Sequence, residues 1–385
     1  MSAPNILWTD PERAKAFAVW LAAITQTHAL KTETLQLASA DASFRRYFRI
    51  STNTGGSCII MDAPPAQENC QPFVHVAALM ADAGLNAPRV LAWDEALGFM
   101  LLSDLGAKTM LDVIEQQPES DRSQLAYDLY REAVSTLVTW QLASRPGVLP
   151  DYDDALLSRE LALFPEWYVQ KHRSIALDSS LQGKLDDLFA QIKASNLNSL
   201  GGARVYVHRD FMPRNLMVAN VAPTLVASRT SLPPEGANFP RGGPSENSAA
   251  DGRLGVLDFQ DAVYGPITYD IASLMRDAFI SWPEDFVLEI TVRYWEQARK
   301  AGLPVGEDFG EYYRAVEWMG LQRHLKILGI FARLTLRDGK PKYLADTPRF
   351  IQYARATCAR YRQLGPLMVL LDEIEGNETR VGYTF

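Results

Sequence analysis

The feature that most constrains this chain is a polar loop between two short apolar runs near its middle. The runs cover residues 204–208 and 216–218, and their β-branched and aromatic side chains are typical of strands. The loop between them carries a carboxylate at Asp210 and an amide at Asn215, five residues apart. Because a strand holds each end of the loop, the sequence predicts a rigid polar site on a strand–loop–strand unit.

A second carboxylate stands in a third strand-like run, residues 254–259, where Asp258 follows four small or apolar residues. Phosphoryl transfer needs one carboxylate to orient the attacking hydroxyl, and an amide and another carboxylate to hold magnesium on the nucleotide phosphates. An asparagine five residues after an aspartate, in H-R-D-x-x-x-x-N, is the pattern of the kinase catalytic loop. Asp210, Asn215 and Asp258 therefore predict a kinase-like site.

The apolar periodicity divides the chain into a strand-rich first part and a helical remainder. The predicted strands of the first part are 44–50, 57–61, 90–93 and 98–102, and its predicted helices are 11–24 and 73–83. The later predicted helices are 123–140, 156–172, 181–192, 269–280, 286–299 and 312–334. This order predicts an α+β protein with a small antiparallel sheet followed by a mainly helical part.

Residues 219–253 break this compact pattern. Of these 35 residues, 16 are Gly, Pro, Ser or Asn, and three arginines balance three acidic side chains. Such a composition buries too little apolar surface to offset the entropy lost on ordering the chain. Long loops without their own structure are uncommon inside domains. We therefore expect a flexible surface insertion between two strands, in preference to a lid over a substrate.

The charge balance and the cysteines limit the classes of function. The formal net charge of −8 disfavours non-specific binding to nucleic acid or to an anionic membrane. The spacing of Cys58, Cys70 and Cys358 matches neither a metal site nor a disulfide framework, which fits a reducing compartment. The start of the chain lacks the pattern of a signal peptide, and apolar residues 17–24 are too few to span a bilayer. We expect a soluble cytoplasmic protein.

Five segments together resemble a known family. They are SADASFRRYFR at 39–49, MDAPP at 61–65, LLSDLG at 101–106, HRDFMPRN at 208–215 and DFQDAVYGP at 258–266. Over nearly the whole chain, the sequence resembles the aminoglycoside-phosphotransferase-like kinases, a bacterial branch of the protein-kinase fold. Within that family it is most similar to the anomeric N-acetylmuramate/N-acetylglucosamine kinases of peptidoglycan recycling.

The resemblance implies a bilobal fold and a pair of substrates. The N-lobe would cover residues 1–105 and bind the nucleotide phosphates, and residues 106–385 would form the helical C-lobe with the catalytic hairpin. ATP and magnesium would be the cofactors, and the anomeric hydroxyl of an amino sugar would be the acceptor; no protein partner is indicated. Composition and spacing alone indicate only a kinase-like site, so a kinase of another small alcohol (aminoglycoside, choline or homoserine type) stays open.

Carried over position by position, the resemblance assigns Asp210 as the catalytic base, and Asn215 and Asp258 as magnesium ligands. Asp270 stands where the family braces the catalytic loop, and the same side chain also suits the N-terminal cap of a helix. His208 is expected to shape the loop by packing and hydrogen bonding rather than to act in catalysis.

The N-terminal part departs from the family at the lysine that contacts phosphate. Strand residues 58–61 contain no lysine, and Glu68 is only a loose candidate for its usual glutamate partner. Arg45 or Arg46 is expected to replace the lysine, because a guanidinium suits phosphate recognition. The two arginines fall on opposite faces of a strand, so at most one should point inward. The alternative is a non-catalytic nucleotide-binding regulator.

Two further groups of nucleotide contacts follow from the resemblance. The phosphate loop contributes Ser43 and Phe44 beside the two arginines. The expected hinge contributes Ser103, Asp104 and Leu105, whose backbone amide and carbonyl groups would pair with adenine. A simple turn from strand to helix is the other interpretation of the hinge segment.

The sequence constrains the acceptor pocket least. Gln260 and Asp261 directly follow the predicted metal ligand, and we expect them near the phosphates or the sugar. A lactyl carboxylate on the sugar would favour a cation. Four cations lie in segments that can face the site: Arg214, Arg276, Arg323 and Lys326. Taken one at a time, each is more typical of a solvated surface charge.

Overall fold

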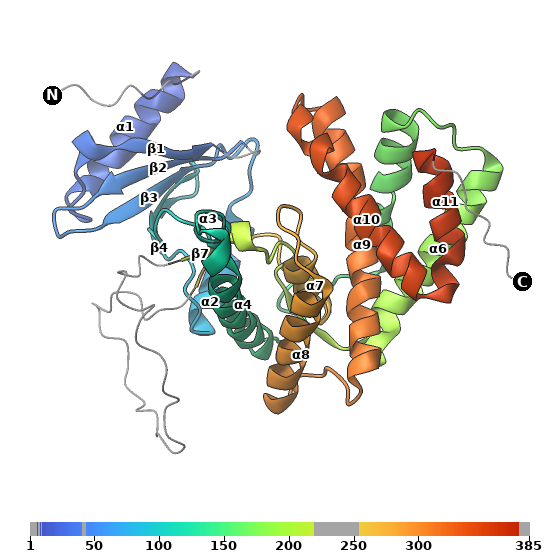
Figure 1. The fold of residues 1–385 in the computed structure, drawn as a ribbon. Helices are drawn as coiled ribbons and strands as arrows, with labels where there is room; N and C mark the ends of the chain where they lie inside the picture. Colours follow the sequence, from blue (N-terminus) through green and yellow to red (C-terminus); the bar gives the residue numbers. More distant parts are fainter. Residues whose placement is uncertain (1–5, 7, 9, 41–43, 219–253, 377–385) are drawn as a thin grey trace, which may run out of the picture. The chain divides into compact units, whose positions relative to one another are not determined.

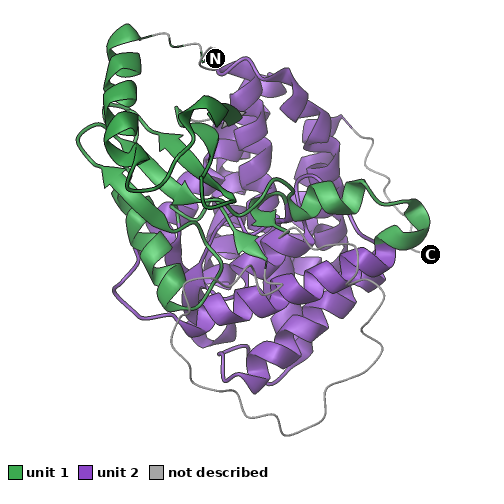
Figure 2. Ribbon diagram, turned by 90° about the vertical axis from the view of Figure 1, so that its left-hand side faces the viewer, with its two compact units in different colours: residues 1–122, 214–261 green, residues 123–213, 262–385 purple. Residues whose placement is uncertain are grey.

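The structure is a computed structural model that describes residues 6, 8, 10–40, 44–218 and 254–376 of the chain. The chain divides into two compact units, residues 1–122 with 214–261 and residues 123–213 with 262–385 (Figure 2). The segment that starts at residue 214 therefore belongs to the first unit, although it follows the predicted catalytic base in sequence. Ser43 and the predicted insertion at 219–253 lie outside the described residues.

The first unit is built on a five-stranded antiparallel sheet with the order β1-β2-β3-β5-β4 (Figure 1). Its strands are β1 (Gln36–Ala40), β2 (Arg46–Ser51), β3 (Ser57–Asp62), β4 (Val90–Asp94) and β5 (Phe99–Ser103). Gly55 and Gly56 supply the positive φ angles of the turn between β2 and β3. The predicted small antiparallel sheet is confirmed, with β1 as an addition to the predicted strands.

Helix α1 (Pro11–Thr25) covers one face of this sheet. Phe17 of the helix packs against Phe48 of β2 and Phe99 of β5, with ring centroids 5.6 and 5.4 Å away, and all three rings are buried. Burying such a ring contributes about 1.5–3 kcal/mol. Because successive side chains of a strand point to opposite faces, Tyr47 and Arg49 of β2 lie on the face that α1 does not cover.

The first unit also contains helix α2 (Gln71–Asp82), helix α3 (Met110–Glu115) and a short hairpin of β7 (Leu216–Met217) and β8 (Gly255–Val256). Phe73 of α2 lies against Phe259, just after β8, with ring centroids 4.9 Å apart. Gly255 leaves room for Leu105, since a Cβ at this glycine would come within 2.9 Å of the leucine side chain. The two predicted strands on either side of the insertion are confirmed, but they are shorter than their apolar runs.

The second unit is mainly helical and packs around the long helix α9 (Phe309–Leu336), whose Trp318, Leu321 and Leu325 are buried in its core. Its other helices are most of α4 (Glu119–Leu142), α5 (Asp154–Leu161), η2 (Phe164–His172), α6 (Ser179–Asn198), α7 (Tyr269–Met275), α8 (Glu284–Lys300), α10 (Thr347–Arg360) and α11 (Gly365–Glu375). Strands β6 (Arg204–Val207) and β9 (Val263–Pro266) pair antiparallel within this unit. Among the helices of the described residues, none is long and apolar enough to cross a membrane.

The predicted helix 156–172 is two segments. It is α-helical as far as Leu161, and the π-helical segment η2 follows from Phe164. Pro165 has no N–H to donate to the preceding turn, which interrupts the α-helical ladder. Gly329 of α9 approaches the same point so closely that a Cβ there would lie 2.3 Å from the backbone carbonyl of Leu163. The apolar spacing therefore continues through a place where the backbone hydrogen bonding changes.

The predicted helix 269–280 ends at Met275. The carboxylate of Asp277 accepts hydrogen bonds from the backbone N–H groups of Phe279 (2.5 Å) and Ile280 (3.0 Å). A side chain thus satisfies the N–H groups that helical carbonyls would otherwise bind, and the chain turns away from the helix.

Candidate active site

The predicted catalytic loop leaves the end of β6 through a strained turn. The carboxylate of Asp270, in the first turn of α7, accepts hydrogen bonds from the backbone N–H groups of His208 (2.7 Å) and Arg209 (3.0 Å). The N–H of Asp210 donates to Nδ1 of His208 (3.2 Å). Arg209 has a φ of 77°, a left-handed conformation that costs a non-glycine residue about 1–3 kcal/mol. The surrounding contacts therefore hold a strained peptide directly before Asp210.

Asp270 and His208 are both buried beneath this loop. Burial raises the pKa of the Asp270 carboxyl, and His208 and the two backbone N–H groups act in the opposite direction. The His208 ring packs edge to face on Phe211, with centroids 5.8 Å apart. The contacts of both side chains are with the loop itself, which suits residues that shape the loop.

A buried acidic side chain that sequence analysis missed, Glu160 of α5, anchors the same loop. Its carboxylate accepts hydrogen bonds from Tyr152 Oη (2.6 Å), Arg209 Nη2 (2.6 Å), Gln322 Nε2 (2.9 Å) and Lys326 Nζ (2.8 Å). Burial alone would raise the pKa of Glu160, but Lys326 and Arg209 lower it to about 2. The only signal in the sequence is a lone acidic residue on the apolar face of a predicted helix.

Arg323 and Lys326 are buried, so the expectation that they are solvated surface charges is wrong. Arg323 is 3% exposed, and the side chain of Lys326 is 11% exposed. Lys326 pairs with Glu160, and Arg323 donates to the backbone carbonyl of Arg209 (2.8 Å). The error has a physical reason: a buried charge persists only where partner groups surround it, and these partners lie far away in sequence.

Asn215 and Asp258 lie together in the first unit. The amide nitrogen of Asn215 is 3.4 Å from Oδ2 of Asp258, and Gln260 donates to Oδ1 of Asp258 (2.9 Å). The two backbones are linked, because the N–H of Leu257 donates to the carbonyl of Asn215 (2.9 Å). Asp258 is exposed and has a φ of 63°. An exposed carboxylate beside an amide fits a magnesium ion that takes its other ligands from phosphates and water.

A metal site made by protein carboxylates, imidazoles and thiols alone is a different arrangement. Groups of three or more His, Cys, Asp or Glu able to hold a metal ion do not occur among the residues that the structure describes.

Arg45 and Arg46 contact different partners. Arg46 pairs with the buried Asp62, which also pairs with Arg13 of α1 (2.5 Å), so Arg46 faces the side of the sheet that α1 covers. Arg45 pairs with Glu68 (3.0 Å), just before α2. Burial would lower the pKa of Arg45, but its neighbours, including Glu68, raise it above its usual value. Glu68, the loose candidate for the glutamate of the pair, therefore does bind a cation in the first unit.

Asp104 ties the expected hinge to the sheet. Its carboxylate pairs with Arg49 of β2 (2.6 Å) and accepts hydrogen bonds from Ser57 Oγ (2.6 Å) and the N–H of Gly106 (3.0 Å). Arg49 also donates to the carbonyl of Gly106 (2.7 Å). Burial would raise the pKa of Asp104, but Arg49 and Ser57 lower it. These contacts fix the backbone of the hinge from both sides of Leu105.

The remaining nucleotide and acceptor candidates are less closely held. Ser103 ends β5, and Leu105 approaches β8. Phe44 is 62% exposed, and Arg214 and Asp261 are exposed as well.

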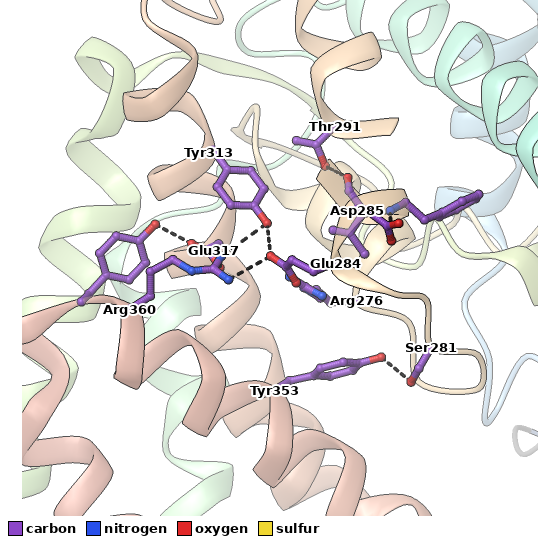
Figure 3. A network of polar contacts seen from close by, with 12 residues as sticks. Arg276, Ser281, Glu284, Asp285, Thr291, Tyr313, Glu317, Tyr353 and Arg360 are labelled. Carbon is purple, nitrogen blue, oxygen red and sulfur yellow. Dashed lines mark hydrogen bonds and ion pairs between the residues drawn. The ribbon is translucent and has the colours of Figure 1, made fainter. Parts of the chain in front are cut away.

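Arg276 lies in a polar network of the second unit (Figure 3). It pairs with Glu284 (2.7 Å), which also binds Tyr313 (2.6 Å) and Arg360 (3.0 Å), and Arg360 pairs in turn with Glu317. Burial would raise the pKa of Glu284, but Tyr313 and Arg276 lower it to about 2. The network ties the start of α8 to α9 and α10, and Arg276 is not brought into hydrogen-bond contact with the catalytic loop.

Comparison with known proteins agrees with the geometry of this site. A model of the phosphotransferase enzyme family matches residues 34–226 and 247–308. These ranges include the loop with Asp210 and Asn215, and the segment with Asp258. The chain belongs to the phosphotransferase enzyme family, as the sequence motifs predicted.

Two relatives carry the name N-acetylmuramate/N-acetylglucosamine kinase. The protein of Neisseria meningitidis serogroup B is 46% identical over 354 residues, which cover 91% of this chain and 94% of the relative. The protein of Pseudomonas aeruginosa is 44% identical over 336 residues, which cover 87% of this chain and 86% of the relative.

A solved structure of the aminoglycoside phosphotransferase APH(2'')-Ib, bound to ADP, matches the fold. The match covers 89% of this chain and 97% of that chain, with a TM-score of 0.54 and 12% sequence identity. At that identity the likeness concerns the fold alone, and it confirms the predicted kinase-like fold class.

Proposed function

We propose that this chain is an ATP-dependent kinase that phosphorylates the anomeric hydroxyl of N-acetylmuramate and N-acetylglucosamine. The observation that carries the proposal is the braced loop of Asp210 and Asn215 beside Asp258, in a chain 46% and 44% identical to kinases named for these sugars. Such an activity fits the recycling of peptidoglycan sugars.

Asp210 acts as the base in this reaction. Its carboxylate orients the anomeric hydroxyl and accepts the proton as the γ-phosphoryl group moves to the sugar oxygen, in line with the departing ADP oxygen. The strained turn at Arg209 and the bond from the Asp210 N–H to His208 fix the direction of the carboxylate. Asp270 and His208 are positioning residues, because they bind the loop backbone.

Asn215 and Asp258 hold magnesium on the nucleotide. With the Asn215 amide turned to present its oxygen, the two side chains offer adjacent oxygen ligands. A bound magnesium ion supplies positive charge that offsets the charge of the transferring phosphoryl group. Gln260 steadies the Asp258 carboxylate through its hydrogen bond, and the exposed Asp261 reaches the phosphates or the sugar.

Arg45 supplies the positive charge that the missing lysine gives in relatives. It lies directly before β2, and its guanidinium pairs with Glu68. The helix that follows Glu68 packs its Phe73 on Phe259, the residue after Asp258. Contacts within the first unit thus connect Arg45 to the segment of the metal ligand.

The adenine binds the backbone of the hinge at Ser103, Asp104 and Leu105, which marks the boundary between lobes of residues 1–105 and 106–385. Asp104 contributes by fixing this backbone to Arg49 rather than through its side chain. Ser43 and Phe44 belong to the loop over the phosphates.

Arg214 and Arg276 are the cations offered to the acceptor. Arg214 is exposed, and Arg276 is paired with Glu284. Arg276 would therefore bind a lactyl carboxylate only by exchanging that partner.

The test is ATP consumption by the purified chain with and without each amino sugar and magnesium. We expect either sugar to stimulate turnover and EDTA to abolish it. Asp210→Asn should lower kcat roughly 10²- to 10⁴-fold, the range typical of a lost general base, while nucleotide affinity stays nearly unchanged. Turnover that ignores the sugar, or a fully active Asp210→Asn variant, would contradict the proposal.

A further inference from the structure

A buried arginine of α9 holds the catalytic loop in addition to Asp270. Nη1 of Arg323 donates to the backbone carbonyl of Arg209 (2.8 Å), and Nη2 donates to Oγ of Ser273 (2.6 Å). The guanidinium lies over the ring of Tyr269, 4.6 Å from its centroid. The backbone of Arg209 is thus held at its N–H by Asp270 and at its carbonyl by Arg323.

The charge of Arg323 lacks an ion-pair partner within the described part of the chain, although the side chain is almost fully buried. Burying a guanidinium in this way is costly unless nearby charges and fixed dipoles offset the lost hydration. Burial would lower the pKa of Arg323, but Tyr269, Asp210 and Asp270 raise it above its usual value. The guanidinium is therefore stabilised by the predicted base and by its brace.

The charges around Asp210 form a small balanced set. Three cations interact electrostatically with Asp210: Arg209, Arg323 and Lys326. Glu160 forms ion pairs with Arg209 (2.6 Å) and with Lys326 (2.8 Å). Arg323 differs from these two cations, because it forms no ion pair with Glu160 within the described residues and donates its hydrogen bonds to Arg209 and Ser273 instead.

We propose that Arg323 is a positioning residue for the phosphoryl transfer: it locks the left-handed turn that aims Asp210. The peptide before Asp210 cannot rotate without breaking a hydrogen bond to a buried side chain, which would leave a buried polar group unsatisfied at a cost of about 1–3 kcal/mol. This inference rests on the proposed role of Asp210 as the base.

Two substitutions separate the hydrogen bond of Arg323 from its charge. Arg323→Gln keeps a donor but removes the charge. We expect kcat to fall roughly 10- to 100-fold with little change in either KM, because a small misplacement of a reacting group has an effect of this size. Arg323→Lys keeps the charge but not the fork that holds Arg209 and Ser273, so it should also lower kcat with little change in either KM.

Arg337→Gln is the matched control, since Arg337 lies at the end of the same helix, is exposed, and pairs with Asp338. It should behave as the wild type.

Wild-type turnover on both sugars separates this inference from the proposed function: an inactive wild type contradicts the proposed function. An active wild type overturns this inference if a folded Arg323→Gln variant keeps a wild-type kcat, or if its kcat falls only together with a large rise in both KM values. If Arg323→Gln does not fold, judged by circular dichroism, Arg323→Lys decides: a wild-type kcat overturns the inference, and a lowered kcat with nearly unchanged KM values supports it.

Discussion

Arg45 and Arg46 are neighbours in sequence, but their side chains bind different carboxylates of the first unit. Arg46 of β2 shares Asp62 with Arg13 of α1, whereas Arg45, directly before the strand, pairs with Glu68. Because Arg46 is held on the α1 side of the sheet, we assign the proposed phosphate contact to Arg45. The pair offers a comparison in which residue type and location are matched and only the direction differs.

Arg45→Met is expected to lower kcat/KM for ATP roughly 10²-fold, because a charged hydrogen bond to phosphate is worth about 1.5–3 kcal/mol. Arg45→Lys should recover much of the loss. Arg46→Met should instead lower the melting temperature by several degrees and leave kcat/KM within about threefold, since it deprives a buried carboxylate of one of its two partners. Steady-state kinetics and thermal unfolding of the three variants check this. Equal kinetic losses in both Met variants would refute the assignment.

Sequence reasoning reached the residues of the site that are defined by local pattern. Asp210 and Asn215 share a loop with fixed spacing, and Asp258 follows an apolar strand. It failed for Glu160 and Arg323, because their burial depends on contacts between α5, α9 and the loop, which are far apart in sequence. Buried charges of this kind have no periodic signature, and alone they are typical of surfaces.

At the scale of elements, the turn after α7 depends on one carboxylate. Oδ1 of Asp277 binds the N–H groups of Phe279 and Ile280, and Oδ2 has no hydrogen-bond partner within the described residues. Burial raises the pKa of Asp277 to about 6, although the two N–H groups and Arg349 act against this shift. The turn is thus held by a group whose ionised form is disfavoured by the fold.

The pH dependence follows from the direction of this shift. The pKa of Asp277 is higher in the folded state than in the unfolded chain, near 3.9, so the folded state binds the proton more tightly. The contribution of Asp277 to the stability of the fold is therefore largest below about pH 4 and is lost as the pH rises through about 6. Asp277→Asn keeps an acceptor for both N–H groups and removes the charge. We expect it to raise the free energy of unfolding by about 1–3 kcal/mol at pH 8 and by about half as much at pH 5.

Urea unfolding of the wild type and of Asp277→Asn at the two pH values checks this prediction. Asn in place of the neighbouring exposed Asp285 is the control, because it removes a carboxylate from the same turn region without removing a buried charge. A destabilisation by Asp277→Asn of equal size at both pH values would be the contrary result.

Periodicity predicted the type of most elements, strands in the first unit and helices in the second, but it did not locate β1, α10 or α11. The ends of helices could not be predicted from the spacing of apolar residues where a specific contact overrides that spacing. Asp277 ends α7 early, and Pro165 with Gly329 of α9 changes the hydrogen bonding after α5. Each of these depends on a side chain or a packing neighbour that the spacing of apolar residues does not encode.

At the scale of the whole molecule, the predicted site residues belong to different units. Arg45, Asp104, Asn215 and Asp258 belong to the first unit, together with the expected hinge, and Asp210, Asp270 and Arg323 belong to the second. The proposed nucleotide contacts and the proposed base are therefore carried by different units, and the chain passes from the second unit to the first between Pro213 and Arg214. A net charge of −8 is compatible with the proposed ATP binding, because a phosphate contact such as the one proposed for Arg45 acts locally.

The central claim is that this site transfers phosphate to the anomeric oxygen of an amino sugar. Phosphorus NMR of the product from ATP, magnesium and N-acetylglucosamine tests it most directly, with correlation of the phosphorus signal to the sugar protons. The predicted result is coupling to the anomeric proton H1, with product forming far more slowly in the Asp210→Asn variant. Coupling to the two C6 protons, or an unchanged rate of product formation by Asp210→Asn, would contradict the account.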